Sequence, residues 1–268
     1  MATDISPMSA QGQLQGNVLL YSRPEPLNKE QHGKLGISTV ERPFEFARSA
    51  HAVPLAVTEF GPASMSYPII FTGADFMPLA IMSIRQNENL YLQADGLFEP
   101  DIYVPAYIRR YPFVLANDDA NQKLIVCIER DAEAVKENGE APLFVNGELS
   151  PFAQQAIEFC TNFEAERQRT VSFVDTLKAL DLFELKEATY NQANPDGTPA
   201  EPIKLADYFG VSETKLNALP ADKLAELRET GALQQIYIHL NSLLNWERLV
   251  TRTVQRDSQA QQPVAANN

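Results

Sequence analysis

Hydrophobic residues in the first half of the chain occur in short runs that prolines and glycines interrupt. The runs of strand length are AVPLAV (52–57), YPIIF (67–71), FMPLAIMSI (76–84), NLYLQ (89–93) and KLIVCIE (123–129). Residues 72–75 and 94–96 have the composition of hairpin turns. Prolines within three of the runs lack a backbone donor, so these strands are expected at sheet edges or just after the proline. This half is predicted to be rich in β-structure.

The second half contains a long stretch without proline or glycine, from residue 152 to residue 194. Ser150 and Pro151 form a typical helix start, because a capping hydroxyl precedes a proline whose missing N–H costs nothing. At about 100° per residue, one narrow stripe collects Phe152, Ala156, Phe159, Phe163, Thr170, Val174 and Leu177. The pattern predicts one helix from residue 151 to about residue 181.

Shorter elements are expected after the long helix. Turn residues at 194–197, between two strand-like segments, predict a hairpin near residues 185–209. A short helix is expected over residues 220–230, with Gly231 as its stop. A last helix from about residue 232 to residue 255 carries an apolar face. The predicted fold class is α+β, with a β-rich N-terminal half packed on a long helix and a helical C-terminal region.

A length of 268 residues accommodates one large domain or two closely packed ones. The pattern favours a single unit over residues 21–250, β-rich over about 21–149 and mainly helical over 150–250. Residues 1–20 are polar and aperiodic, as expected for a flexible tail. Residues 251–268 are expected to form the end of the last helix and a disordered tail.

Composition narrows the classes of function. The 35 acidic and 22 basic residues give a net charge of −13, which disfavours binding to nucleic-acid phosphates or to an anionic membrane surface. No apolar run approaches the roughly 18 residues of a membrane span, and residues 1–30 lack a signal-peptide pattern. We therefore expect no nucleic-acid partner, no membrane insertion and a cytoplasmic location, with the cell surface reached only by a signal-independent route.

Sequence motifs of catalysis and cofactor binding are missing. The chain has no GxGxxG, Walker A, GxSxG or HExxH pattern. Its three histidines are scattered singly, and Cys127 and Cys160 lie in apolar patterns, where free cysteines are usually buried. A Cys–His pair that meets only in space stays open at this point. We expect no cofactor, no metal and no catalytic residue, and we favour a non-catalytic protein over an enzyme.

The segment YVPAYIRRYPF (103–113) contains four candidate binding residues, which are Tyr107, Arg109, Arg110 and Tyr111. Pro105 can begin a single helical turn and Pro112 must end it, so both arginines are expected on a short, rigid corner. Guanidinium groups bind carboxylate or phosphate through two parallel bonds and stack on aromatic rings. The corner indicates contact with a small anionic ligand or with a protein or peptide partner. Internal pairing with acidic side chains and packing on rings is the alternative.

Two charged residues fall on the apolar faces of predicted helices. Arg167 lies close to the stripe of the long helix, and Glu247 lies on the stripe of the last helix. A charge in such a place needs a partner, or its stem covers the core while its tip reaches water. Arg167 is therefore a candidate binding residue, and an ion pair between Arg167 and Glu247 is one testable hypothesis.

His239 and the single tryptophan, Trp246, share a second flank of the last helix with Leu243 and Val250. His239 and Trp246 are candidate binding residues for a partner, and a homo-oligomer through this helix is possible. Packing of the same flank on the β-rich half is the alternative, and we favour it.

Acidic residues gather between positions 129 and 140. They are Glu129, Asp131, Glu133, Glu137 and Glu140. The spacing lacks the pattern of a calcium-binding EF-hand loop, so a solvated loop is predicted.

A series of short motifs runs along the chain. It consists of PLNKEQHGKL (26–35), VPLAVTEF (53–60), YPIIF (67–71), ENLYLQADG (88–96), YVPAYIRRYPF (103–113), CIE (127–129), GELSP (147–151), LNALPADKLAELRETGAL (216–233) and HLNSLLNWERLV (239–250). In this order the motifs resemble the SapC family of bacterial proteins over roughly residues 21–250. Leu97 departs from the family, which usually has an aromatic residue after the Asp-Gly turn.

The resemblance implies a partner role rather than a known reaction. The family name comes from an association with a surface layer, and no enzymatic residue carries over. Members occur beside genes for outer-membrane receptors and for halogenase-like and cupin-like hydroxylase proteins. The resemblance thus suggests a non-catalytic binding protein, accessory to uptake or to peptide or protein modification. An enzyme or substrate-presenting partner of an oxygenase or halogenase, and a surface-layer component, are the alternatives.

Overall fold

The structure is a computed structural model, and it describes residues 18–118, 123–190 and 201–261. Residue contacts divide the chain into two compact units. Unit 1 comprises Met1–Arg48, Leu92–Glu99 and Val104–Gln168, and unit 2 comprises Ser49–Tyr91, Pro100–Tyr103 and Arg169–Asn268. The two units do not follow the predicted change from a β-rich to a mainly helical region near residue 150, because strands from both halves of the sequence pair in unit 2. Residues 1–17 and 262–268 of the two predicted tails lie outside the described residues, and the single unit over 21–250 stays a prediction.

Unit 1 contains two small antiparallel sheets and a hairpin. Strands β1 (Pro24–Pro26), β7 (Lys123–Glu129) and β6 (Phe113–Asp118) form the first sheet in that order, and β8 (Val135–Glu137), β2 (Leu35–Ile37) and β9 (Ala141–Pro142) form the second. The hairpin pairs β10 (Phe144–Val145) with β11 (Glu148–Leu149). The short helices are α1 (Lys29–His32), η1 (Glu45–Ala47) and α3 (Ala106–Arg109). Buried Phe113, Ile128 and Leu143 pack with Ala153 and Cys160 from the first half of α4 (Pro151–Ala179).

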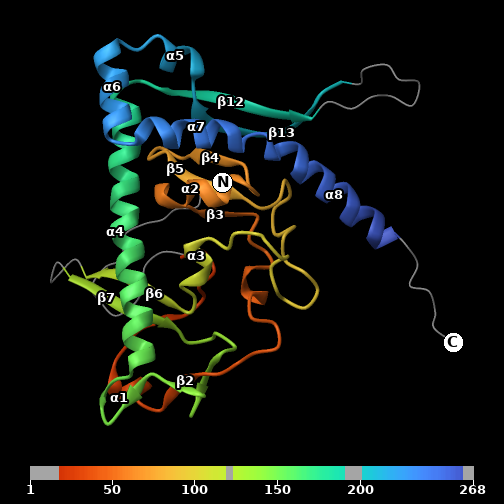
Figure 1. The fold of residues 1–268 in the computed structure, drawn as a ribbon. Coiled ribbons are helices and arrows are strands. Elements are labelled where there is room, and N and C mark those ends of the chain that lie inside the picture. Colours follow the sequence, from red (N-terminus) through yellow and green to blue (C-terminus); the bar gives the residue numbers. More distant parts are fainter. Residues whose placement is uncertain (1–17, 119–122, 191–200, 262–268) are drawn as a thin grey trace. The chain divides into compact units, whose positions relative to one another are not determined.

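Unit 2 is built on one five-stranded antiparallel sheet. Its strand order is β12 (Phe183–Tyr190), β13 (Ile203–Val211), β4 (Ile69–Thr72), β5 (Met77–Ile81) and β3 (Ala52–Pro54). Its helices besides the end of α4 are η2 (Val57–Glu59), α2 (Phe60–Ser64), α5 (Glu213–Asn217), α6 (Ala221–Glu229), α7 (Ala232–Ser242) and α8 (Asn245–Gln261). Strands β12 and β13 run side by side where the hairpin near 185–209 is predicted (Figure 1). Helices and antiparallel sheets together give the predicted α+β fold class.

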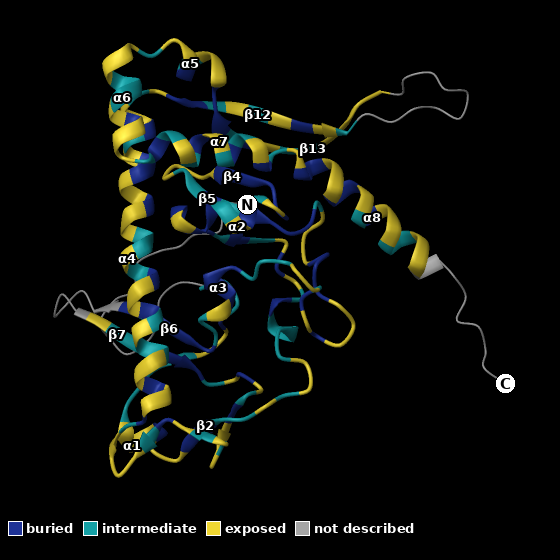
Figure 2. Cartoon of the chain, in the orientation of Figure 1, coloured by how far each residue is buried: buried dark blue, intermediate teal, exposed yellow. Residues whose placement is uncertain are grey.

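Helix α4 confirms the prediction from residue spacing. Its start is capped by the Ser150 hydroxyl, which accepts the Ala153 N–H at 3.1 Å. Its end follows from Asp181, which adopts a left-handed conformation (φ 50°) that a helix cannot continue. Buried and exposed residues alternate along it with helical periodicity (Figure 2). No helix among residues 18–118, 123–190 and 201–261 has the length and hydropathy of a membrane span.

The strand predicted over NLYLQ (89–93) is wrong. Only Leu92 forms a β-bridge, to Phe98 across the turn at Gly96. The side-chain oxygen of Asn89 accepts the Tyr91 N–H at 3.0 Å. This backbone N–H is therefore not available for a hydrogen bond to a neighbouring strand. The strands predicted near residues 69, 77 and 123 do form, and the turn between the first two contains Gly73 at φ 72°.

The last helix predicted over residues 232–255 is in fact two helices, α7 and α8. At residues 243, 244 and 246 the backbone N–H groups bond to carbonyls three positions back, which tightens the chain into a turn. The Asn245 amide stabilises this break by donating to the carbonyls of Ser64, Tyr67 and Ser242 at 2.7, 3.2 and 2.9 Å. The apolar spacing continues across the break, so periodicity alone does not reveal it.

Candidate functional site

The corner between Pro105 and Pro112 has the predicted form. Helix α3 is a single turn that follows Pro105, and Arg109 and Arg110 occupy its last position and its C-cap. The N–H groups of Ile108 and Arg109 both bond to the Pro105 carbonyl, at 2.9 and 3.1 Å. Tyr111 and Pro112 then lead directly into β6, so the two arginines are held on a rigid backbone.

Arg110 is surrounded by aromatic rings of unit 1. Its guanidinium carbon lies 4.0 Å from the centre of the Tyr107 ring, 4.8 Å from Phe163 and 5.7 Å from Tyr21. The hydroxyls of the two tyrosines bond elsewhere, that of Tyr21 to the Phe113 carbonyl at 2.7 Å and that of Tyr107 to the Leu19 carbonyl at 3.0 Å. The Nε atom of Arg110 is buried and has no hydrogen-bond partner among the described residues. Burial of a donor without an acceptor costs about 1–3 kcal/mol, so the site holds unused hydrogen-bonding capacity.

The acid–base properties of this cluster follow from burial and from the Arg110 charge. Burial raises the pKa of the Tyr21 and Tyr107 hydroxyls, and the Arg110 charge only partly opposes this effect. Burial also raises the pKa of the Cys160 thiol to about 11, again against the Arg110 charge. All three groups are therefore uncharged at neutral pH, and Arg110 is the charged member of the cluster.

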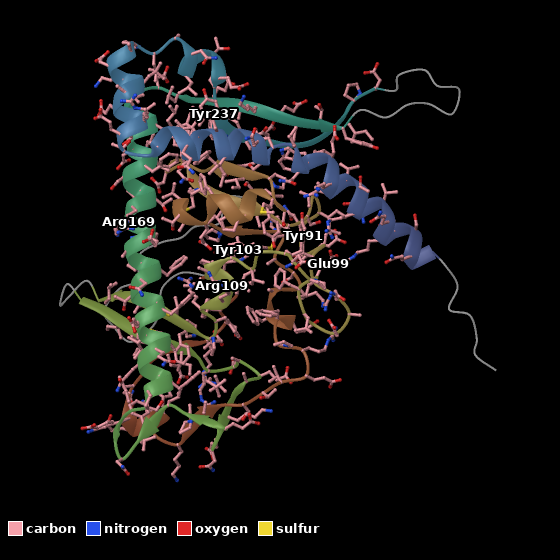
Figure 3. The ribbon with its side chains drawn as sticks, viewed as in Figure 1. Tyr91, Glu99, Tyr103, Arg109, Arg169 and Tyr237 are labelled. Atoms are coloured by element: carbon pink, nitrogen blue, oxygen red, sulfur yellow. The ribbon has the colours of Figure 1, made fainter. Side chains whose placement is uncertain are left out.

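Arg109 has a different environment from its neighbour. Its Nε donates to the Val104 carbonyl at 2.9 Å, and its guanidinium lies 5.2 Å from the centre of the Phe159 ring. The residue is exposed, and it is labelled on α3 in Figure 3. Arg109 thus presents a cation at the surface, whereas Arg110 is half-buried among rings.

Tyr111 extends the aromatic cluster. Its ring stacks on Phe46 at a centroid distance of 3.7 Å and lies 5.4 Å from Tyr21. Burial, together with the charges of Glu129 and Asp131, raises the pKa of the Tyr111 hydroxyl to about 12. Tyr107, Arg110 and Tyr111 therefore form one site with Tyr21.

Arg167 has its partner within α4. Its Nε and Nη2 bond to the two carboxylate oxygens of Glu164 at 2.8 and 2.7 Å. Burial alone would raise the pKa of Glu164, but these bonds and the nearby Arg110 charge outweigh it and lower that pKa. Arg167 therefore pairs with Glu164 and not with Glu247 as hypothesised. Residues three positions apart lie on the same face of a helix, so the Glu164 carboxylate is within reach.

The prediction that the acidic residues after position 129 form a solvated loop is wrong for Glu129. This residue ends β7 and is 1% exposed. Its carboxylate accepts the Ser22 N–H at 2.8 Å, the Ser22 hydroxyl at 3.0 Å and the Arg23 N–H at 2.9 Å. A buried carboxylate needs such donors. The N-terminal segment supplies these three, and the Asp131 N–H supplies another at 3.1 Å.

We call residues 18–23 the N-terminal strap. Tyr21 in this strap donates its hydroxyl to the Phe113 carbonyl at 2.7 Å, and Tyr107 donates to the Leu19 carbonyl at 3.0 Å. Sequence reasoning assigned the first residues to a tail and missed Tyr21. The run VLLY (18–21) is the one signal that could have identified it, because it interrupts an otherwise polar segment.

His239 and Trp246 belong to unit 2 and lie inside it. The Val211 N–H donates to Nε2 of His239 at 3.1 Å, so the ring proton is on Nδ1, which lies 2.8 Å from the Ile69 carbonyl. Trp246 is 8% exposed and packs near Tyr208 with ring centres 5.8 Å apart. Both residues thus pack on strands of their own unit, and a contact with a second copy there stays a prediction.

Cys127 and His239, which could act as a nucleophile, a base or a metal ligand, are buried in the fold. The described parts of the chain contain no cluster of three or more histidine, cysteine or acidic residues that could hold a metal ion. Burial raises the pKa of the Cys127 thiol to about 12, so this residue is not a thiolate at neutral pH. Burial lowers the pKa of His239 to about 4.

Residues 27–249 match the SapC family. The chain belongs to this family. The match covers the corner, helix α4 and the whole sheet of unit 2, and it confirms the resemblance drawn from the short motifs. The comparisons with curated proteins and with solved structures gave no match.

Proposed function

We propose that this SapC-family protein is a non-catalytic binding protein that recognises a carboxylate or phosphate group through the arginine corner of unit 1. The observation that carries the proposal is the state of Arg110. Its guanidinium lies against the Tyr107 and Phe163 rings, and its buried Nε has no acceptor among the described residues. A charged donor group held in this way has capacity for an anionic ligand that its own surroundings leave unused.

The charge balance of the corner supports the same conclusion. The acidic group that acts on Arg110 within the described cluster is Glu164, and both oxygens of Glu164 are bonded to Arg167. Arg109 adds a second, exposed guanidinium on the same helical turn. Arg110 thus keeps its positive charge beside a committed carboxylate, in a protein of net charge −13. Opposite local and global signs favour a ligand that docks at this place.

The surroundings of Arg110 hold its side chain in one orientation. Arg110 is only partly buried, while the Tyr107 and Phe163 rings hold its orientation from two helices. A guanidinium held between rings loses little freedom when it binds, so more of the interaction energy appears as affinity.

The state of the nucleophilic groups supports a non-catalytic role. Cys127 and Cys160 are buried thiols with raised pKa values, and both ring nitrogens of His239 bond to the backbone. A catalytic nucleophile or base needs an accessible and correctly charged form, which these groups lack at neutral pH. We therefore place the protein as an accessory component that holds a peptide or small molecule for an uptake or modification system.

The test is isothermal titration calorimetry of the full chain with two probes, inorganic phosphate and glutarate. We expect binding of at least one probe, with affinity reduced at least tenfold by Arg110→Met. This variant keeps the length and apolar stem of the side chain and removes its charge and donors. Arg110→Lys keeps the charge but lacks the planar fork, so an intermediate loss is expected.

Arg228→Met is the matched control, because it removes an exposed arginine of unit 2 whose nearest acid, Glu229, is 3.8 Å away. This control should bind as the parent protein does. The proposal is overturned if neither probe binds, or if Arg110→Met and Arg228→Met bind equally well.

A further inference from the structure

The N-terminal strap covers one side of the Arg110 site. Three rings surround the guanidinium, and two of them, Tyr107 and Phe163, belong to helices α3 and α4. The third, Tyr21, belongs to the strap, which has no helical or strand hydrogen-bond pattern before β1. Movement of the strap would therefore remove one wall of the site and leave the other two in place.

The strap is held by the Tyr21 and Tyr107 hydroxyl bonds, by the Arg130 N–H bond to the Arg23 carbonyl at 2.9 Å, and above all by one carboxylate. Glu129 receives both backbone N–H groups of Ser22 and Arg23 and the Ser22 hydroxyl, at 2.8 to 3.0 Å. Hydrogen bonds to a charged acceptor are about twice as strong as neutral ones. Glu129 lies 107 residues from Ser22 in the chain, so this contact exists only when the strap is seated.

The seated strap also carries a local cost. Leu20 has a positive φ of 76°, in the left-handed region that disfavours a branched side chain. Such a conformation costs an L-residue roughly 1–2 kcal/mol, and it is retained only where surrounding contacts impose it. Glu129 therefore makes several of the hydrogen bonds that hold the strap in place, whereas the strained backbone of Leu20 favours its release.

Tyr21 is the strap residue whose ring lies against the Arg110 guanidinium. Its ring centre lies 5.7 Å from the Arg110 guanidinium carbon, and its hydroxyl donates to the Phe113 carbonyl at 2.7 Å. A carboxylate or phosphate oxygen binds a guanidinium more strongly than the face of an aromatic ring does. A ligand with such an oxygen can thus replace Tyr21 on Arg110.

From these contacts we propose that the N-terminal strap is a displaceable lid on the Arg110 site, that Glu129 is its latch, and that an anionic ligand binds by displacing Tyr21. This inference rests on the proposed function, since it describes the regulation of the same site. The seated strap lowers the apparent affinity in proportion to the fraction of molecules in which it is open. Weakening the latch therefore strengthens binding.

The experiment measures glutarate and phosphate binding to the full-length parent, to Glu129→Gln and to Glu133→Gln. In Glu129→Gln an amide NH₂ faces backbone donors, so the latch opens and apparent affinity should rise about tenfold. Glu133→Gln removes the same charge from an exposed residue four positions away and should leave affinity unchanged within about twofold. Ser22→Ala removes the hydroxyl bond alone, and a rise of about two- to threefold is expected.

Hydrogen exchange of the unmutated protein gives a second measurement that does not depend on how Glu129→Gln folds. The Ser22 and Arg23 amides, which bond to Glu129, should exchange at least tenfold faster when the probe saturates the site. Unchanged or slower exchange at these amides, combined with binding that depends on Arg110, overturns the lid and leaves the binding function intact. Absence of any Arg110-dependent binding in the parent and in Glu129→Gln overturns both.

Discussion

Arg110 in unit 1 and His239 in unit 2 are both polar groups held among aromatic rings, and they differ in how their hydrogen-bonding capacity is used. Each ring nitrogen of His239 has one backbone partner, and Phe71 lies 5.0 Å from its ring centre. Arg110 has three rings around it but leaves its Nε without an acceptor among the described residues. Complete pairing is typical of a structural group, whereas an unused donor on a charged group points to a ligand. The comparison therefore separates a residue that holds the fold from a residue available for recognition.

The largest expected effect is on stability when His239 is replaced. His239→Leu fills a similar volume but leaves the Val211 N–H and the Ile69 carbonyl buried and unpaired. Each such group costs about 1–3 kcal/mol, so the free energy of unfolding should fall by about 3 kcal/mol in urea denaturation. His239→Gln, which retains one donor and one acceptor, should lose less. If the free energy of unfolding of His239→Leu falls by less than about 1 kcal/mol, His239 does not have the structural role assigned to it.

The pH dependence of stability is the next effect in size. The pKa of His239 is lowered to about 4 by burial, whereas the unfolded chain has an ordinary histidine pKa near 6.5. The unfolded state therefore binds a proton first as pH falls. The contribution of His239 is complete above about pH 6.5 and decreases by about 3 kcal/mol toward pH 4.

Denaturation at several pH values, compared with His239→Gln, measures this contribution. The variant has no titrating group at position 239, so the difference between the two pH profiles isolates the histidine. Parallel profiles would show that His239 is not buried as a neutral ring.

The smallest expected effect on stability belongs to Arg110→Met. Loss of ring contacts with Tyr107 and Phe163 destabilises the protein, but removal of an unpaired buried donor offsets that loss, so a net change within about 1 kcal/mol is expected. Arg167→Met, which breaks a half-buried pair with Glu164, should also change stability by about 1 kcal/mol or less. Thermal unfolding of the two variants checks this, and a loss of several kcal/mol for Arg110→Met would make Arg110 a structural residue like His239.

Local features of the chain were predictable because their causes are local. Helix α4 follows from a capping serine, a proline and an apolar spacing, and the turn of α3 follows from two prolines seven positions apart. The positions of Arg109 and Arg110 on a rigid corner could therefore be predicted. The break between α7 and α8 could not, because Asn245 is held by carbonyls of Ser64 and Tyr67, about 180 residues earlier in the chain.

The environment of each candidate residue depended on contacts between distant segments. Tyr21 reaches Phe113 across 92 residues, and the Glu129 carboxylate collects donors from a segment 107 residues away. His239 was a candidate for binding because an exposed face and a buried face have the same spacing along a helix.

The amino-acid sequence by itself determined the α+β class, the long helix, the proline-bounded corner and membership of the SapC family, because these depend on residue order and short-range geometry. Only the tertiary structure decided that both ring nitrogens of His239 are bonded, that Arg167 pairs with Glu164, and that Arg110 keeps an unused Nε donor. Hydrogen-bond satisfaction depends on which distant groups meet, and no pattern along the chain encodes it.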